Sequence, residues 1–167
     1  MTSRVFVDTN VLVYAEDNAE REKQKRASAI LTELIPSGRM VISTQVLQEL
    51  FNAATRKLRL PAVYVRGLVE DYSQLDVVLV RSELILGAID LHRLCAISFW
   101  DALVIRAASE GGCTRLLSEN LQHGQTIEGV RIENPFLATR SAEPRARYKT
   151  RGTSRRSIRS SARAGPR

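Results

Sequence analysis

The sequence VFVDTN at residues 5–10 decides the expected architecture. Its first three residues are apolar and β-branched or aromatic, which predicts a short buried strand. Asp8 follows directly, and a carboxylate at the end of a buried strand is costly to desolvate unless it is paired, hydrogen-bonded or bound to a metal. A structural interpretation is also open, because Asp8 or Asn10 can cap a helix that begins near Val11.

Strands and helices alternate beyond this stretch. Further short strands are expected at residues 40–42, 77–80, 115–117 and 130–132. Helices are expected at residues 20–35, 44–57, 61–75, 82–95 and 98–111. Alternation of this kind predicts an α/β fold in which helices cover both faces of a mostly parallel sheet. In open parallel sheets, functional sites form beyond the carboxyl ends of the strands.

Two details of the second of these helices matter for the site. Thr44 is expected to cap it. Its apolar stripe is expected to consist of Leu47, Leu50, Phe51 and Ala54. Glu49 then points away from this stripe, on a polar face with Gln45, Asn52 and Arg56, which either lines a cleft or meets water.

The basic charge of the chain is concentrated at its C-terminal end. Residues 138–167 contain ten of the 25 Lys and Arg residues and one of the 18 acids, so this segment carries +9 and residues 1–137 carry −2. The segment has almost no large apolar residues, and we predict that it is a disordered tail after a single domain at residues 1–137. Either it binds RNA phosphates through its charge, or it is a dispensable extension.

Composition also points to a soluble protein of a reducing compartment. The two cysteines, Cys95 and Cys113, lack metal-binding spacing and are expected to be buried small apolar residues, with no zinc site. No apolar run is long enough for a membrane span, and no signal peptide is evident. We therefore expect a cytoplasmic location.

A second acid, Asp101, lies at the start of a predicted helix. Ser98 and Asp101 form a capping box in which Asp replaces the usual Glu, so a purely structural role is open. Capping does not exclude function, because a carboxylate in the first turn of a helix is kept ionised by the helix dipole and remains a good ligand for a hard cation.

A third group follows the strand at residues 115–117. Ser118, Glu119 and Asn120 are plausible helpers to a metal site and equally ordinary turn formers, and His123 is expected to be a plain loop histidine. Together with Asp8, Glu49 and Asp101, these residues fall where a parallel sheet presents its carboxyl edge. Clustered carboxylates repel one another, and a divalent cation such as Mg²⁺ or Mn²⁺ relieves that repulsion.

The chain resembles the PIN-domain ribonucleases, and among them the VapC toxins of toxin–antitoxin pairs. The resemblance rests on four motifs in order and on a closing strand near residues 129–136, and it spans residues 4–136. The motifs are VFVDTNVLVY (5–14), QVLQELFN (45–52), ISFWDAL (97–103) and LLSENL (116–121).

This resemblance implies a three-layer α/β/α sandwich and Mg²⁺-dependent endonucleolytic cleavage of RNA, with Mn²⁺ as a substitute. It implies Asp8 and Asp101 as metal ligands and Glu49 as an acid that binds metal or positions water. It further implies a cognate VapB-like antitoxin and a homodimer. One departure is Asn120, which occupies the position of the family's frequent fourth acid and brings no charge, so Glu119 is the candidate to compensate.

Two other functions remain open on the sequence. The missing fourth acid and the basic tail are compatible with an RNA-binding module that has lost catalysis. A nuclease that acts on DNA is a third possibility, because an acidic centre does not discriminate between sugars.

Overall fold

The computed structural model describes residues 3–137 of the chain. These residues form a six-stranded sheet with the strand order β3-β2-β1-β4-β6-β5. All neighbours pair in parallel except β5 and β6, which are antiparallel. The strands are β1 (Val5–Val7), β2 (Met40–Ser43), β3 (Asp76–Val78), β4 (Arg115–Leu117), β5 (Thr126–Ile127) and β6 (Val130–Glu133).

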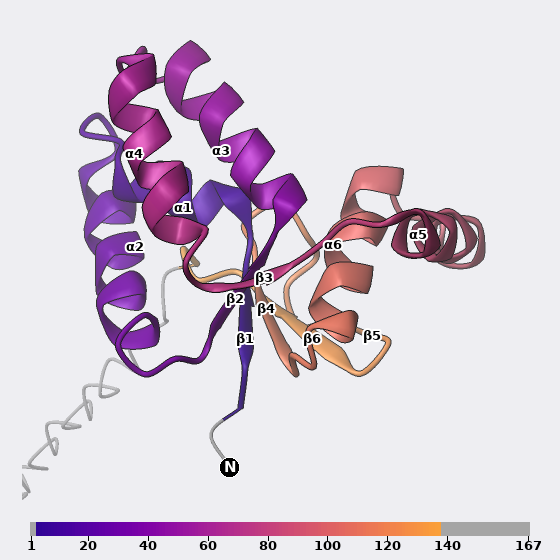
Figure 1. Cartoon of the computed structure of the whole chain (residues 1–167). Coiled ribbons are helices and arrows are strands. Elements are labelled where there is room, and N and C mark those ends of the chain that lie inside the picture. Colours follow the sequence, from indigo (N-terminus) through magenta and orange to yellow (C-terminus); the bar gives the residue numbers. More distant parts are fainter. Residues whose placement is uncertain (1–2, 138–167) are drawn as a thin grey trace, which may run out of the picture. The chain divides into compact units, whose positions relative to one another are not determined.

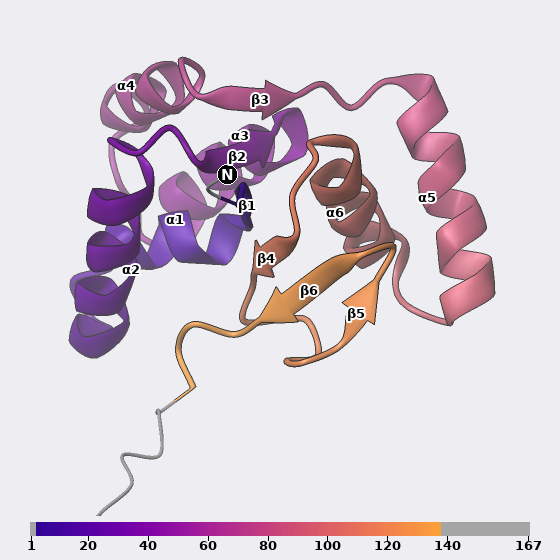
Figure 2. The ribbon, with the colours of Figure 1, turned by 90° about the horizontal axis from the view of Figure 1, so that it is seen from below.

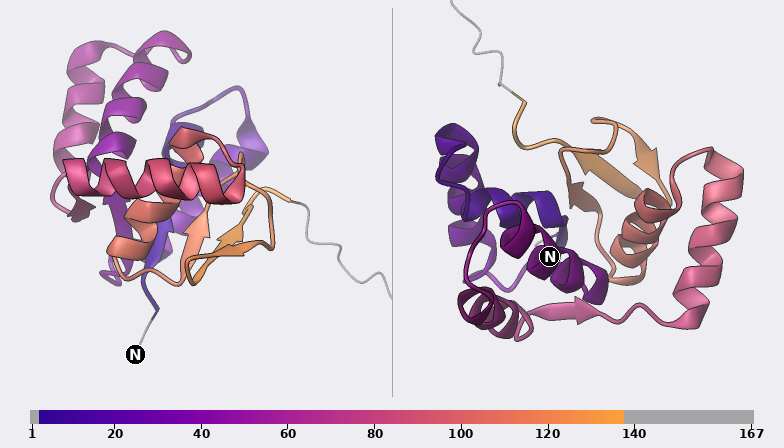
Figure 3. Two further views of the ribbon diagram at one scale, coloured as in Figure 1. Left: turned by 90° about the vertical axis from the view of Figure 1, so that its right-hand side faces the viewer. Right: turned by 90° about the horizontal axis from the view of Figure 1, so that it is seen from above.

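Six helices cover the sheet in two layers. The helices α1 (Thr9–Ala15), α2 (Arg21–Leu34), α3 (Thr44–Arg56) and α4 (Ala62–Tyr72) pack together on one side, whereas α5 (Ser82–Cys95) and α6 (Phe99–Glu110) lie on the other (Figures 1 and 2). Of this second pair, α6 contacts the sheet and α5 packs on the outside of α6 (Figure 3). The predicted α/β/α layering with a mostly parallel sheet is confirmed.

The central strand explains why the fold is organised around residues 5–10. All three residues of β1 are fully buried, and β1 lies between β2 and β4. A strand covered on both faces reads as a continuous apolar run, which is what residues 5–7 show. The helix α2 buries the stripe expected from helical periodicity, which consists of Ala27, Ile30, Leu31 and Leu34.

The structure differs from the expectation in the residue that caps α3 and in the end of β3. Ser43, not Thr44, caps α3, because the Ser43 hydroxyl accepts a hydrogen bond from the Val46 amide. The Thr44 hydroxyl instead accepts a hydrogen bond of 3.0 Å from the Val80 amide. The strand β3 ends at Val78 rather than Val80, because Val78 pairs with Ser43 and the partner strand β2 ends there.

The expected apolar stripe of α3 is also partly wrong. Val46, Leu50 and Ala54 face the core, whereas Phe51 is 43% exposed. Leu47 and Phe51 line an apolar groove together with Val69 of α4. Gln45 is buried, although its polar character placed it on the outer face.

Smaller differences occur near the helix ends and in the last hairpin. Pro61 precedes α4 as its cap residue instead of opening it, and α4 ends at Tyr72. The strand β5 was not predicted, because a strand of two residues is too short to show an alternating pattern. In the turn that joins β5 to β6, Glu128 and Gly129 both have positive φ, as tight hairpin turns require, and Gly129 is the residue of this turn that the sequence could have indicated. Cys113 is buried as expected, whereas Cys95 is exposed.

Two further expectations concern a membrane span and the C-terminal segment. Within residues 3–137, no helix is long and apolar enough to cross a membrane. The predicted disordered tail at residues 138–167 lies outside the described residues.

Candidate acidic site at the carboxyl edge of the sheet

Asp8 is the centre of the site and is almost completely buried, with 7% of its surface exposed. It occupies the point where β1 becomes α1, and it caps α1 because its Oδ1 accepts a hydrogen bond of 2.7 Å from the Thr9 amide. Its Oδ2 accepts hydrogen bonds from the Ser118 hydroxyl at 2.7 Å and from the side-chain Nδ2 of Asn10 at 2.9 Å. The capping interpretation is therefore correct, and it leaves a functional role open.

Burial raises the pKa of Asp8 above its ordinary value, and the hydrogen bonds from Ser118 and Thr9 oppose this effect. The negative charges of Glu49 and Asp101 raise the pKa of Asp8 further. The structure thus brings the three predicted acids close enough for their charges to interact, although Glu49 and Asp101 lie on different helices. None of the ion pairs among residues 3–137 includes any of the three.

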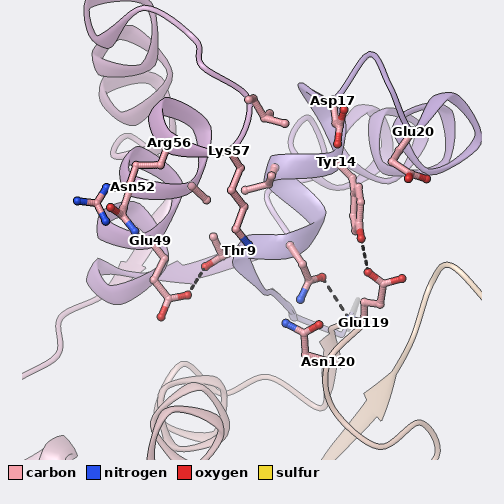
Figure 4. A pocket seen from close by; sticks show the side chains of 14 residues that line it. Thr9, Tyr14, Asp17, Glu20, Glu49, Asn52, Arg56, Lys57, Glu119 and Asn120 are labelled. Carbon is pink, nitrogen blue, oxygen red and sulfur yellow. Dashed lines mark hydrogen bonds between the residues drawn. The ribbon is translucent and has the colours of Figure 1, made fainter.

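Glu49 is held by two donors from two elements. The Thr9 hydroxyl donates a hydrogen bond of 2.9 Å to Oε2 of Glu49. The side-chain Nε2 of Gln45 donates a hydrogen bond of 2.8 Å to Oε1 of Glu49. Figure 4 shows the carboxylate of Glu49 pointing toward Thr9 at the wall of a pocket. Of the two interpretations of this helix face, the structure supports the cleft.

Asp101 lies in the first turn of α6. Its amide donates a hydrogen bond of 3.1 Å to the Ser98 hydroxyl, so Ser98 caps the helix as expected. Because α6 leads back to the start of the parallel strand β4, its N-terminal end lies at the carboxyl edge of the sheet, on the side opposite α1. This placement explains why Asp101 raises the pKa of Asp8.

The residues after β4 take part in two separate sets of hydrogen bonds. Ser118 is fully buried and belongs to the Asp8 network. The carboxylate of Glu119 accepts hydrogen bonds from Lys23 at 2.6 Å and from the Tyr14 hydroxyl at 2.5 Å. Burial raises the pKa of Glu119, but these hydrogen bonds and the charge of Lys23 outweigh it and lower the pKa overall. The charge of Glu119 is therefore matched by Lys23, and its role as a substitute for the fourth acid stays a prediction.

A pocket with a volume of about 740 Å³ is lined by Glu49, Glu119 and the two residues that follow Asp8, Thr9 and Asn10, whereas Asp8 and Asp101 themselves do not line it (Figure 4). Glu49 and Asn52 line the pocket from α3. Glu119 and Asn120 line it from the segment that follows β4. Two basic residues that follow along α3, Arg56 and Lys57, also line the pocket, and Figure 4 shows Lys57 pointing into it, toward Thr9. No site role was predicted for Lys57, Thr9 or Gln45. Gln45 was placed on the polar face of Glu49, and its spacing of four residues from Glu49 is the signal that they can form a hydrogen bond.

The donor set fits a divalent cation of the Mg²⁺ kind. Within residues 3–137, no three Asp, Glu, His or Cys side chains converge closely enough to enclose a metal ion by themselves. Mg²⁺ does not require such a cage, because it retains several waters and is commonly bound by one or two carboxylates. A buried Asp8 that is repelled by two neighbouring acids and pairs with no described cation is the environment that such an ion stabilises.

These features define an α/β protein with an acidic centre at the carboxyl edge of a parallel sheet. The sequence family described as PIN domain matches residues 5–126, and the chain belongs to this family. No curated protein sequence matches the chain at a significant level.

Solved structures with a similar fold include proteins of toxin–antitoxin systems. A toxin–antitoxin complex from Klebsiella pneumoniae aligns with a TM-score of 0.60 and 17% identity over 80% of this chain and 98% of that chain. DNA-bound VapBC from Salmonella typhimurium aligns with a TM-score of 0.59 and 21% identity over 80% and 99% of the two chains. VapC20 of Mycobacterium tuberculosis, a toxin that cleaves the sarcin–ricin loop, aligns with a TM-score of 0.54 and 20% identity over 67% and 86%.

Proposed function

We propose that this chain is a Mg²⁺-dependent endoribonuclease, with Mn²⁺ able to substitute, and the toxin of a toxin–antitoxin pair. The observation that carries the proposal is the position of Asp8, a buried carboxylate at the carboxyl end of β1 that Ser118 and Asn10 hold by hydrogen bonds. The charges of Glu49 and Asp101 act on this carboxylate and raise its pKa. Membership of the PIN domain family and the fold shared with VapC toxins support it.

In this proposal, Asp8 and Asp101 would hold one metal ion, and Glu49 would orient the water that attacks an RNA phosphodiester. Ser118 supports the site by its hydrogen bond to Asp8. Asn120, which lines the pocket, contributes a side-chain amide at the position where the family often has a fourth acid. Glu119 stabilises the wall of the pocket by its ion pair with Lys23.

A bound divalent cation stabilises negative charge on a phosphoryl group and makes water more acidic. The chain itself supplies the orientation. The Thr9 hydroxyl on α1 donates a hydrogen bond to one carboxylate oxygen of Glu49, so the acid is already held at the wall of the pocket before a substrate enters.

The pocket also suits a polyanion despite the charge of −2 on residues 1–137. Arg56 and Lys57 line it beside the acids, where they can bind phosphates on either side of the scissile bond. The solved relative whose RNA target is stated, VapC20, cleaves the sarcin–ricin loop. At 20% identity this chain and VapC20 share the fold, and the fold alone does not specify which RNA is cut.

The partners proposed for the chain follow from the same comparisons. Similar structures include a toxin–antitoxin complex and VapBC assemblies. We accordingly propose a VapB-like antitoxin as the partner of this chain. We also propose a homodimer, from the resemblance to the VapC toxins, and a cytoplasmic location, which suits two free cysteines.

A second candidate function is an RNA-binding module with weak or no catalysis. It is favoured by one observation: Asn120 brings no charge, and the adjacent acid, Glu119, is paired with Lys23. This function predicts salt-sensitive RNA binding that needs residues 138–167, with no cleavage in any metal.

The deciding experiment is a cleavage assay on matched RNA and DNA oligonucleotides with wild type, Asp8→Asn and Asp101→Asn. We expect wild type to cut RNA in Mg²⁺ or Mn²⁺ and to stop in EDTA, and both variants to be inactive. Asp90→Asn, at an exposed position on α5, is the matched control. Full cleavage by Asp8→Asn would show that the site assignment is wrong.

A further inference from the structure

Gln45 is a buried amide that the proposed roles above leave without a function of its own. It lies one helical turn before Glu49 on α3, and 4% of its surface is exposed. Its Nε2 donates the hydrogen bond of 2.8 Å to Oε1 of Glu49. Its own Oε1 is buried and has no hydrogen-bond partner among residues 3–137.

The orientation of this amide is determined by Glu49. If the amide were turned over, its oxygen would face a carboxylate oxygen and the hydrogen bond would be replaced by repulsion. The observed orientation keeps the bond to Glu49 and leaves Oε1 unpaired. The hydrogen bond to Glu49 is therefore formed even though it leaves a buried acceptor, Oε1 of Gln45, without a partner.

Stability alone does not account for a glutamine at this position. A buried polar atom without a partner costs free energy, whereas an apolar side chain of similar shape costs nothing of this kind. The neighbouring buried positions of α3 are apolar (Val46, Leu50 and Ala54). Nor does Glu49 need Gln45 to be solvated, because Glu49 lines an open pocket where water can reach it.

We infer that Gln45 is a positioning residue, which together with Thr9 fixes the Glu49 carboxylate in the orientation that the reaction requires. The two donors arrive from different elements, α3 and α1, and each bonds a different oxygen of the same carboxylate. A carboxylate held at both oxygens cannot rotate. This inference rests on the role proposed for Glu49.

The test compares Gln45→Met with Gln48→Met in the full chain. Methionine is close to glutamine in length and volume but makes no comparable hydrogen bond. Gln48 lies three residues further along the same helix and is exposed, so it controls for the substitution itself. Gln45→Leu serves as a second variant in case the first does not fold.

We expect the kcat for RNA cleavage by Gln45→Met to fall roughly 10- to 100-fold, the range expected when a catalytic group is slightly misplaced. KM should stay within about twofold, because phosphate contacts are untouched. The Tm should be unchanged or raised, because an unpaired buried oxygen is removed. A purely structural role predicts the reverse, with a lower Tm and a loss of activity that follows the loss of folded protein.

A second readout does not depend on cleavage. The side-chain amide resonances of Gln45 in ¹⁵N-edited NMR spectra should shift when Mg²⁺ is added to wild type and should not shift in Asp8→Asn. No shift in wild type, or a kcat for Gln45→Met within twofold of wild type, would overturn the inference. A wild type that cleaves no RNA would instead refute the proposed function, and the amide resonances would still decide whether Gln45 belongs to a metal site.

Discussion

The Ser118 hydroxyl donates a hydrogen bond of 2.7 Å to Oδ2 of Asp8 and thereby joins the carboxyl ends of β4 and β1. These two residues are 110 positions apart in the sequence. The bond is made inside the protein, where both partners are shielded from water. It favours the ionised form of a carboxylate whose pKa is raised by burial.

Replacing this hydroxyl should weaken both the fold and the site. We expect Ser118→Ala to lower the free energy of unfolding by about 1–3 kcal/mol, because Asp8 stays buried with one donor fewer. Metal-dependent cleavage should fall about 10- to 100-fold, as is usual when a residue that orients a metal ligand is removed. Chemical denaturation and a cleavage assay measure the two effects. Ser28→Ala, on the exposed face of α2, is the control, and equal behaviour of the two variants would contradict the prediction.

Binding of a divalent cation should stabilise the folded protein. At a free Mg²⁺ concentration 100 times the Kd, the expected gain is about 2.7 kcal/mol if the unfolded chain does not bind the ion. Thermal unfolding with and without Mg²⁺ measures this gain as a rise in Tm, which EDTA should reverse. Asp101→Asn should show a much smaller rise than Asp90→Asn. An equal rise in the two variants would place the ion elsewhere.

Much of this fold follows from local patterns. The buried strand at residues 5–7 and the stripe of α2 were predicted because their burial depends on periodicity alone. The cap of α3 was misassigned because Ser43 and Thr44 are adjacent and equally able to cap. In the structure Ser43 caps α3, and the Thr44 hydroxyl bonds Val80 instead, a contact over 36 positions that leaves no local pattern.

The site was predictable to a similar extent. Asp8 and Asp101 stand out because one follows a strand and the other lies in the first turn of a helix at the carboxyl edge of the sheet. Glu49 lies within α3 and stands out only because it points away from the apolar residues of that helix. Gln45 did not stand out, because a polar residue on a helix is normally exposed. Its burial follows from the way α3 packs, which places Val46 rather than Leu47 in the core.

The ion pair between Glu133 and Arg115 should make stability depend on pH. Hydrogen bonds from Arg115, with distances of 2.6–3.1 Å, lower the pKa of Glu133 below its ordinary value of 4.5. A lowered pKa means that the ion pair contributes stability above pH 4.5 and that this contribution is lost as the pH falls through the lowered pKa. Glu133→Gln should therefore be less stable than wild type at pH 7, by about 1 kcal/mol because Arg115 is partly exposed. The difference should vanish at low pH, and denaturant unfolding at several pH values would reveal a constant difference if the ion pair were not its source.

The two basic residues of the pocket should contribute to RNA affinity and not to the chemical step. Arg56 and Lys57 line the pocket beside the acids, and Lys57 points into it (Figure 4). We expect Arg56→Gln and Lys57→Gln each to weaken RNA binding and to reduce the slope of log K against log salt by about one, because each neutralises one phosphate. Binding is measured in Ca²⁺ or with Asp8→Asn, so that cleavage does not interfere. Lys25→Gln, at an exposed position of α2, should leave the slope unchanged. A variant that lost cleavage at saturating RNA without a change in affinity would show instead that its cation acts on the reacting phosphate itself.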